Sequence, residues 1–267
     1  MIDFSKISSD RPYNFHSHTQ FCDGKAPMEQ FASEAVARGF SHYGFSPHSP
    51  VPIESPCNMQ SDQVPLFLDE VMRLKALYSG CGTEFYAAME IDYLGDGWGP
   101  SHPYFASLPL DYRIGSVHFI PDQQGRLVDI DGRYENFRRK MTEHFLDDIR
   151  YVVDTFYDQS LAMVRAGGFD IIGHLDKVGH NASHYRPGIE DEPWYQVRVN
   201  ELIDAVIASG LTVEINTKAW AEHGRMFPAP RHWQRLRDAG VTLIVNSDAH
   251  VPALIDASRQ VALQMLE

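Results

Sequence analysis

Short apolar stretches alternate along the chain with longer amphipathic stretches. The apolar stretches have the length of buried strands, and several are rich in the β-branched and aromatic residues that strands favour. We predict seven strands, at residues 13–18, 40–45, 85–91, 112–119, 169–174, 211–215 and 241–245. The chain is therefore predicted to be an α/β protein.

Most segments between the predicted strands have the periodicity of helices. In residues 27–38, Phe31, Ala35 and Val36 form an apolar stripe, and Pro27 and Gly39 fit the two ends of the helix. Further helices are predicted after residue 61, over 134–166 as one or two helices, over 193–209 and 228–239, and from about residue 252. We predict loops at 46–50, at 95–111 with a short helix, and at 121–133 and 176–192.

Alternating strands and helices imply parallel strands with right-handed crossovers. No glycine-rich phosphate loop follows a predicted strand, so an open nucleotide-binding sheet has little support. A closed or nearly closed TIM-like barrel fits better, and its functional site should lie at the carboxyl ends of the strands. Because neither repeats nor a linker are visible, we expect residues 1–267 to form a single domain.

Composition and charge narrow the functional classes. Hydrophobic residues make up 43% of the 267, enough for a full core, and no run of about 18 apolar residues predicts a membrane span. The net charge of −13 argues against a nucleic-acid-binding surface, although bound cations would still allow a small anionic substrate. Without a secretory signal or a C-x-x-C pair among its three cysteines, the chain is expected in the cytoplasm, and its oligomeric state stays open.

Histidines and acids recur at the ends of the predicted strands. His16 and His18 lie two apart on the first strand, so both imidazoles can point to the same side. Similar groups lie at or after five other strands, which gives nine candidate metal ligands: His16, His18, Asp23, His48, Glu90, His118, His174, Asp248 and His250. Any one of them has an ordinary explanation; Asp23 before Gly24, for example, is also a turn signal. Together they indicate two or three divalent cations, because buried carboxylates need a counter-charge.

The spacing of these residues resembles the PHP (polymerase and histidinol phosphatase) superfamily. The closer likeness, to monofunctional histidinol-phosphate phosphatases, rests on residues 170–176 and 214–218, and the resemblance covers residues 13 to about 260. The motifs that carry it are His16-Ser-His18, Asp23-Gly24, His48, Met89-Glu90, Gly115-Ser-Val-His118, Ile172-Gly-His174 and Asn246-Ser-Asp248-Ala-His250.

The resemblance implies a distorted (β/α)7 barrel with a trinuclear metal site. The first metal would be held by His16, His18, Glu90 and Asp248; the second by a bridging Glu90 with His118 and His174; and the third by Asp23, His48 and His250. Imidazole and carboxylate ligands without thiolate allow zinc, iron or manganese, and do not choose among them.

The implied activity is that of a metal-dependent phosphate monoester hydrolase, most like a histidinol-phosphate phosphatase of histidine biosynthesis. We hypothesise that a hydroxide bridging two metals attacks phosphorus in line, with Glu90 as the bridging ligand. The general acid is left open between Asp248 and His250. Candidate substrate-binding residues on the loops after the fifth and sixth strands are Lys177, Arg186, Asn216, Lys218 and Arg225. For Asn216 we consider two roles, orienting a ligand or capping its strand. A substrate ammonium group would need a carboxylate, for which we consider Asp92, Asp122 and Asp176.

Three other interpretations remain. An amidohydrolase-type enzyme also begins with His-x-His, but it would normally have eight strands and would not explain Asp23, His48 and His250. A nucleotide or oligonucleotide phosphoesterase would share the metals, but we expect it to have a more basic site. A non-enzymatic module should have lost ligands, and no member of the set is missing.

Overall fold

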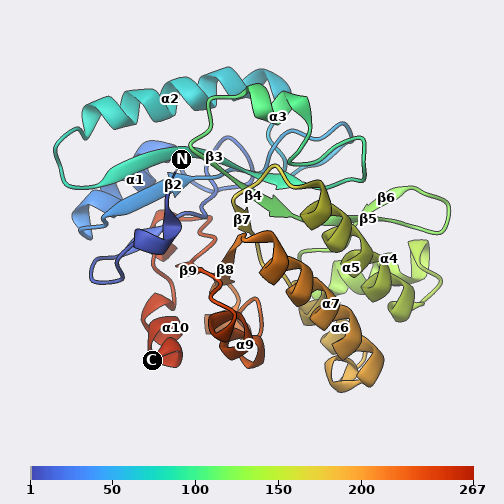
Figure 1. The fold of residues 1–267 in the computed structure, drawn as a ribbon. Coiled ribbons are helices and arrows are strands. Elements are labelled where there is room, and N and C mark those ends of the chain that lie inside the picture. Colours follow the sequence, from blue (N-terminus) through green and yellow to red (C-terminus); the bar gives the residue numbers. More distant parts are fainter. Residues whose placement is uncertain (1) are drawn as a thin grey trace.

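A sheet of seven parallel strands forms the centre of the molecule in the computed structural model, which describes residues 2–267 (Figure 1). The strands are hydrogen-bonded in chain order: β1 (Tyr13–Asn14), β2 (His42–Phe45), β3 (Glu84–Asp92), β4 (Tyr112–Ser116), β7 (Ile171–Ile172), β8 (Thr212–Asn216) and β9 (Leu243–Asn246). With helices around it, the sheet forms a distorted, nearly closed (β/α)7 barrel. The predicted TIM-like architecture is confirmed.

The barrel closes between β1 and β9 mainly through side chains. The side chain of Asn246 accepts a hydrogen bond from the backbone N–H of Phe15 at 2.8 Å, and Asn14 accepts one from Ser247 at 2.9 Å. Farther along, the backbone N–H of His18 donates to the Ala249 carbonyl at 2.8 Å. Two buried asparagines thus replace ladder hydrogen bonds at the seam, which leaves the barrel distorted at the point where several candidate ligands lie.

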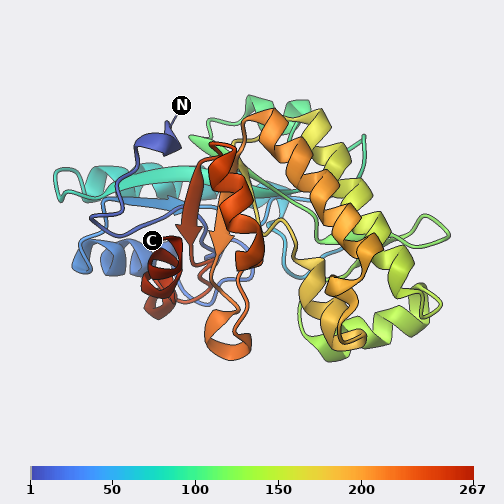
Figure 2. The same ribbon diagram turned by 60° about the horizontal axis from the view of Figure 1, so that its bottom comes forward.

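Helices cover the outside of the barrel in two main groups (Figures 1 and 2). The helices α1 and α2 pack on β2 and β3, whereas α5 and α7 lie side by side over the β7 region. Among residues 2–267, no helix is long and apolar enough to cross a bilayer. The helices are α1 (Met28–Ala37), α2 (Val64–Leu77), α3 (Pro103–Ser107), α4 (Tyr134–His144), α5 (Ile149–Ala166), α6 (Val178–Tyr185), α7 (Pro193–Ser209), α8 (Trp220–His223), α9 (Trp233–Asp238) and α10 (Arg259–Leu266).

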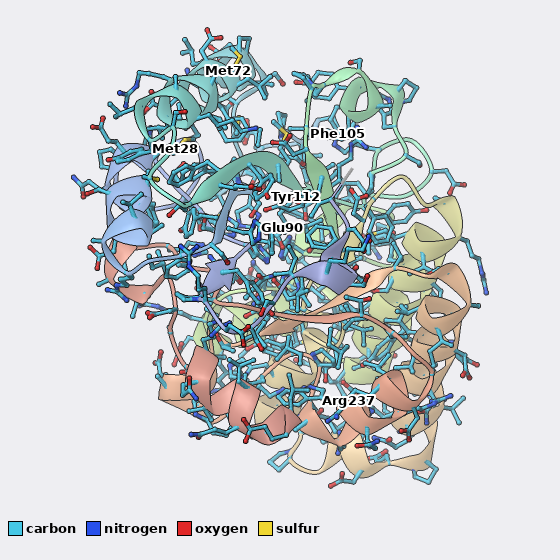
Figure 3. The ribbon with its side chains drawn as sticks, turned by 60° about the vertical axis from the view of Figure 1, so that its left-hand side comes forward. Met28, Met72, Glu90, Phe105, Tyr112 and Arg237 are labelled. Carbon is cyan, nitrogen blue, oxygen red and sulfur yellow. The ribbon has the colours of Figure 1, made fainter. Side chains whose placement is uncertain are left out.

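Aromatic residues fill the amino-terminal end of the barrel. Phe4 packs edge-on against Phe15 and Tyr112, with ring centroids 5.0 and 5.6 Å apart, and the Tyr112 hydroxyl donates to the Phe15 carbonyl. A Cβ on Gly44 would lie 1.8 Å from that hydroxyl, so only glycine fits there. Tyr112 on β4 pairs with Ala88 on β3, two residues before Glu90, and Figure 3 labels both Tyr112 and Glu90. One end of the barrel is therefore closed by packing, and the other is free for chemistry.

Apart from shorter strands, such as Tyr13–Asn14 where 13–18 was predicted and Ile171–Ile172 where 169–174 was predicted, the structure differs from the sequence prediction in three segments. Residues 178–185 form α6 inside a predicted polar loop, because Val178 and Ala182, four apart, pack on the core. The predicted fourth strand ends at Ser116, and the following excursion is a two-stranded hairpin of β5 (Phe119–Pro121) and β6 (Leu127–Asp129). The short helix α8 was not predicted after β8.

Candidate metal centre

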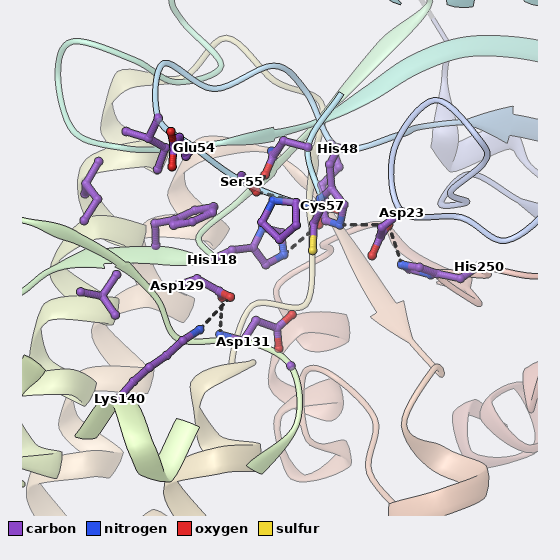
Figure 4. A pocket seen from close by; sticks show the side chains of 18 of the residues that line it. Asp23, His48, Glu54, Ser55, Cys57, His118, Asp129, Asp131, Lys140 and His250 are labelled. Carbon is purple, nitrogen blue, oxygen red and sulfur yellow. Dashed lines mark hydrogen bonds and ion pairs between the residues drawn. The ribbon is translucent and has the colours of Figure 1, made fainter. Parts of the chain in front are cut away.

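The nine predicted ligands lie at the carboxyl ends of six barrel strands and converge on one site. Glu90 is on β3 itself, and the histidines and Asp248 follow β1, β2, β4, β7 and β9 within a few residues, whereas Asp23 lies farther along the loop after β1. Figure 4 shows Asp23, His48, His118 and His250 around one cavity. Three overlapping groups have the geometry to hold an ion: His16, His18 and Asp248; His48, Glu90 and His118; and His18, Asp23, His48 and His250. Their role as ligands stays a prediction.

Glu90 has one carboxylate oxygen in each of two histidine groups. Its Oε2 is 3.2 Å from His16 Nε2 and 3.5 Å from His18 Nε2. Its Oε1 is 2.9 Å from His174 Nε2 and 3.5 Å from His118 Nε2. A carboxylate placed in this way can bridge two cations, which is the arrangement expected from the sequence.

Asp23 gathers a further group at the edge of the site. Its Oδ1 is 3.2 Å from His250 Nε2, 3.8 Å from His18 Nδ1 and 3.9 Å from His48 Nε2. The loop that carries Asp23 is tight, because a Cβ on Gly24 would lie 2.4 Å from the His18 carbonyl. The Asp23-Gly24 pair therefore forms a turn and also directs a carboxylate into the site. Its interpretation as a turn signal is compatible with its interpretation as a source of a metal ligand.

Four buried polar atoms of the site make no well-aligned hydrogen bond within the described chain, although each lies 3.0–3.2 Å from a carboxylate or imidazole atom. They are His16 Nε2, His18 Nε2, Asp23 Oδ1 and His48 Nδ1. An unsatisfied buried polar atom costs about 1–3 kcal/mol. Four such atoms in one pocket, all of types that bind zinc, iron or manganese, fit divalent cations as their missing partners.

Charge and burial prepare these groups to bind cations. Burial alone would raise the pKa of Glu90, but the surrounding histidines, led by His16, hold it well below the ordinary value. For Asp248, burial is likewise outweighed, mainly by the Lys218 ammonium, and its pKa is also held low. Burial and neighbouring histidines lower the pKa of His18, which keeps its imidazole neutral. Ionised carboxylates and a neutral imidazole are the forms that bind metals.

A second layer of polar residues holds the histidines in place, and sequence reasoning missed it. Glu214, fully buried on β8, accepts from His16 Nδ1 at 2.6 Å and from the His174 backbone N–H at 3.0 Å. Asp92 lies 2.7 Å from His118 Nδ1. Carboxylates behind metal-bound histidines fix the ring tautomer and orientation. For Glu214 the signal was available, since it is the charged residue inside the otherwise apolar predicted strand 211–215, whereas Asp92 was considered only as a partner for a substrate ammonium group.

A cavity of about 640 Å³ opens beside the predicted ligands. Asp23, His48, Glu90, His118, Asp248 and His250 line its inner end. Its outer wall combines apolar side chains from the β5–β6 hairpin, such as Phe119 and Val128, with acidic residues Glu54, Asp129 and Asp131 (Figure 4). The cavity thus offers a cation-binding end and an acidic, partly apolar end.

Only part of the predicted substrate-binding set reaches this cavity. Lys218 lines it and donates to Asp248 Oδ1 at 3.1 Å. Lys177 does not line the cavity but lies 3.3 Å from Asp131, which does. Asn216 is fully buried and donates to both Glu214 and Asp248 at 3.1 Å. It therefore orients acidic groups behind the site, one of its two predicted alternatives.

The structure does not bring the two predicted arginines to the cavity. Arg186 pairs with Glu192 at the end of α6, on the surface. Arg225 is largely buried, and it pairs with Glu190 at 2.6 Å and Asp176 at 3.2 Å. Both guanidinium groups form ion pairs with carboxylates of the protein, because acidic residues are frequent in the loops of a chain with a net charge of −13.

The three carboxylates considered for a substrate ammonium group already have partners as well. Asp92 holds His118, and Asp176 pairs with Arg225. Asp122 accepts from Arg126 at 2.8 Å and caps its own turn. Asp129 and Asp131, which line the cavity, also have partners, Lys140 at 2.9 Å and Lys177 at 3.3 Å, and both lie in the segment 121–133 that was predicted as a loop.

Comparison with known proteins identifies the family. The sequence model of the PHP domain matches residues 14–218, which is more than half of the chain. The chain belongs to the PHP domain family. A protein of Deinococcus radiodurans named probable histidinol-phosphatase is 25% identical to this PHP domain protein over 244 residues, covering 89% of this chain and 85% of that one.

Two solved structures resemble this PHP domain protein along nearly their whole length. The candidate histidinol phosphatase HisK from Listeria monocytogenes has a TM-score of 0.82 at 15% identity, covering 94% of this chain and 99% of that one. The histidinol phosphate phosphatase of Lactococcus lactis, solved with zinc, L-histidinol and phosphate, has a TM-score of 0.63 at 18% identity, covering 96% and 94%. At these identities the likeness shows a shared fold, and the recognition made from the motifs is confirmed.

Proposed function

We propose that this protein is a metal-dependent phosphate monoester hydrolase whose substrate is histidinol phosphate. The observation that carries the proposal is the cage around Glu90, in which imidazoles and carboxylates from six strands meet with unpaired atoms. Membership of the PHP domain family and the similarity to a protein named probable histidinol-phosphatase support the substrate.

The chain provides the parts that phosphate ester hydrolysis needs. Divalent ions in this cage would neutralise the phosphoryl oxygens and lower the pKa of water towards neutrality. Glu90 would hold two of the ions at a fixed spacing, and Glu214 and Asp92 would keep His16 and His118 in the tautomers that bind them. We propose zinc, iron or manganese as the ions, two or three in number, because the ligand set lacks thiolate.

Lys218 and His250 are placed to assist at the leaving group. The Lys218 ammonium lies 3.1 Å from Asp248 Oδ1 and 3.4 Å from His250 Nε2, at the lining of the cavity. It can donate a hydrogen bond to a phosphoryl oxygen. His250, 18% exposed at the same wall, would act through a water that protonates the leaving oxygen, because its own ring nitrogens would be occupied by a metal ion and by the Asp248 carbonyl at 3.0 Å.

The outer wall of the cavity favours a small cationic leaving group over a polynucleotide. Glu54, which has no ion-pair partner among the described residues, would attract an amine, whereas Asp129 already pairs with Lys140 at 2.9 Å and Asp131 with Lys177 at 3.3 Å. The apolar side chains of Phe119 and Val128 provide a surface for a flat ring such as imidazole. An oligonucleotide substrate would have to bring several negative charges past these acids, so we do not propose one.

We further propose that residues 1–267 function as one PHP domain. The family match ends at residue 218, but β9 and Asp248 lie beyond it and complete the barrel and the cage. A role in histidine biosynthesis would also place the protein in the cytoplasm. The substrate is expected to be a small phosphate ester, without nucleic acid or membrane as a partner.

A substrate panel tests the proposal. Purified protein is assayed for phosphate release from histidinol phosphate, p-nitrophenyl phosphate, a nucleoside monophosphate and a short single-stranded oligonucleotide, with elemental analysis of the same preparation. We expect kcat/KM to be highest for histidinol phosphate, with at least two equivalents of metal per chain. Faster hydrolysis of the oligonucleotide, or no phosphate release from any of the monoesters, would overturn it.

A further inference from the structure

A second cluster of histidines lies outside the cavity, on the segments that follow β7 and β8. His180 and His184 are four residues apart on α6, so they share one face of the helix. His223 ends α8 and lies against them, with ring centroids 4.7 Å from His180 and 6.0 Å from His184. One nitrogen from each ring lies within 4.8 Å of the others.

The spacing of these nitrogens is close to that of a metal site. Zinc binds imidazole nitrogen at about 2.0–2.1 Å in tetrahedral geometry, which places the nitrogens about 3.3 Å from one another. Contraction from at most 4.8 Å needs only small side-chain rotations, and His184 and His223 are exposed. Three imidazoles without thiolate suit zinc and its neighbours nickel and copper.

The rings are also in a suitable chemical form. His184 Nδ1 donates to the His180 carbonyl at 2.8 Å, so its Nε2 keeps a free lone pair. A metal-bound histidine almost always donates its other N–H in this way. Burial, together with His184 and His223, lowers the pKa of His180 to about 4, which keeps that ring neutral at physiological pH.

The electrostatic surroundings allow a cation at this position. Lys177 and Arg225 are the nearest positive groups, but Lys177 pairs with Asp131 and Arg225 pairs with Asp176 and Glu190. The nearest acid to His223 is the exposed Glu222, at 3.7 Å. Without an ion, three imidazoles meet here with little to hold them together.

We propose that His180, His184 and His223 form a separate, solvent-facing transition-metal site that links α6 to α8. Zinc is the ion we assign to it, with water completing the coordination. None of these three residues is among those lining the cavity of the PHP site, and the proposal does not depend on the proposed function. The ion would tie together the segments after β7 and β8, which carry Lys177 and Lys218.

Zinc titration of the full-length protein, already loaded with its catalytic metals, tests this site. The H184Q/H223Q variant removes two exposed ligands, and H42Q removes a histidine on β2 that lies outside both sites. By calorimetry and elemental analysis, we expect wild type and H42Q to bind one more zinc equivalent than H184Q/H223Q. Zinc should raise the melting temperature of the first two proteins and not of the third, while phosphatase activity stays equal in all.

Two results would overturn the proposal. One is an equal number of zinc equivalents in wild type and H184Q/H223Q. The other is a parallel loss of zinc and activity in the variant, which would assign the cluster to the catalytic machinery. Circular dichroism establishes that the variant is folded, and the single substitution H184Q, at an exposed position on α6, repeats the comparison if the double variant is not.

Discussion

At the scale of single residues, Glu90 has the most demanding position in the molecule. It is 1% exposed, it lies within 3.5 Å of five histidines, and Ser116 donates to its Oε1 at 2.7 Å. A neutral side chain of the same shape could keep the hydrogen bond from Ser116 but could not balance two cations. The charge of Glu90, rather than its shape, is therefore what the site needs.

The substitution Glu90→Gln tests this charge requirement. We expect it to lower kcat/KM for phosphate ester hydrolysis on the order of 10³-fold, since about 4 kcal/mol of charge stabilisation is lost at the reacting centre. Bound metal, measured by elemental analysis, should fall by at least one equivalent per chain. Glu84→Gln is the matched control, because Glu84 lies on the same strand, exposed and at the opposite end. Full activity of Glu90→Gln would refute the bridging role.

At the scale of elements, Arg225 connects the segments that follow β7 and β8. Its guanidinium group pairs with Asp176, which is 1% exposed, and with Glu190, which is 12% exposed. Removing one partner from a buried ion pair leaves an uncompensated charge. Arg225→Leu should therefore lower the free energy of unfolding by about 3–5 kcal/mol. Denaturant unfolding measures this change.

The same ion pair predicts a pH dependence of stability. Burial alone would raise the pKa of Glu190, but the hydrogen bond from Arg225 outweighs it and lowers the pKa below its ordinary value. A lowered folded-state pKa gives stability that is present above the unfolded value, near 4.5, and is lost as pH falls through the folded value. Wild type should lose this increment below about pH 4.5, and Arg225→Leu should lose less of it, because Ser183 and Arg231 still contact Glu190.

Arg186→Leu is the control for Arg225→Leu, because both arginines were predicted from sequence to bind phosphate. Arg186 pairs with Glu192 in solvent, and an exposed pair contributes about 0–1 kcal/mol. If the two variants lose equal stability, the burial argument for Arg225 fails. If Arg225→Leu is fully stable but raises KM for the phosphate ester, the phosphate-binding role is restored.

Prediction from the sequence succeeded where local pattern decides the outcome. The strand ends were visible as apolar runs that finish in a histidine or an acid, so the convergence around Glu90 could be predicted. The role of Arg225 could not, because its partners Asp176 and Glu190 lie 35 residues or more away in the chain. The helix α6 was missed because it presents only Val178, Ala182 and the partly buried Tyr185 to the core among polar neighbours.

At the scale of the whole molecule, the candidate metal centre lies where six strands end, whereas the aromatic cluster of Phe4, Phe15 and Tyr112 fills the opposite end of the barrel. Ions in the cage would join strand ends that the sheet itself holds poorly at the seam between β1 and β9. The fold should therefore survive metal removal, because the aromatic end and the helices remain packed, but with lower stability.

Metal removal by a chelator tests this coupling between the site and the barrel. The experiment uses the H184Q/H223Q background, so that the surface histidines contribute nothing. Metal ions that bind only the folded state stabilise it by mass action. If their removal lowers the free energy of unfolding by several kcal/mol, the melting temperature of a chain of this size should fall on the order of 10 °C. Far-ultraviolet circular dichroism at 25 °C should be unchanged, and readdition of zinc or manganese should restore the melting temperature.

The Glu90→Gln variant supplies the control for this experiment. In Glu90→Gln the side chain that would bridge the ions is neutral, so the variant should bind them less tightly. The chelator should therefore lower its melting temperature much less than it lowers that of the protein with Glu90. An equal response of both proteins would mean that the stabilising ions bind elsewhere. No response in either, with metal shown to be removed, would mean that the strand ends are held by Glu214, Asn216 and Asn246 alone, and that the cage serves only chemistry.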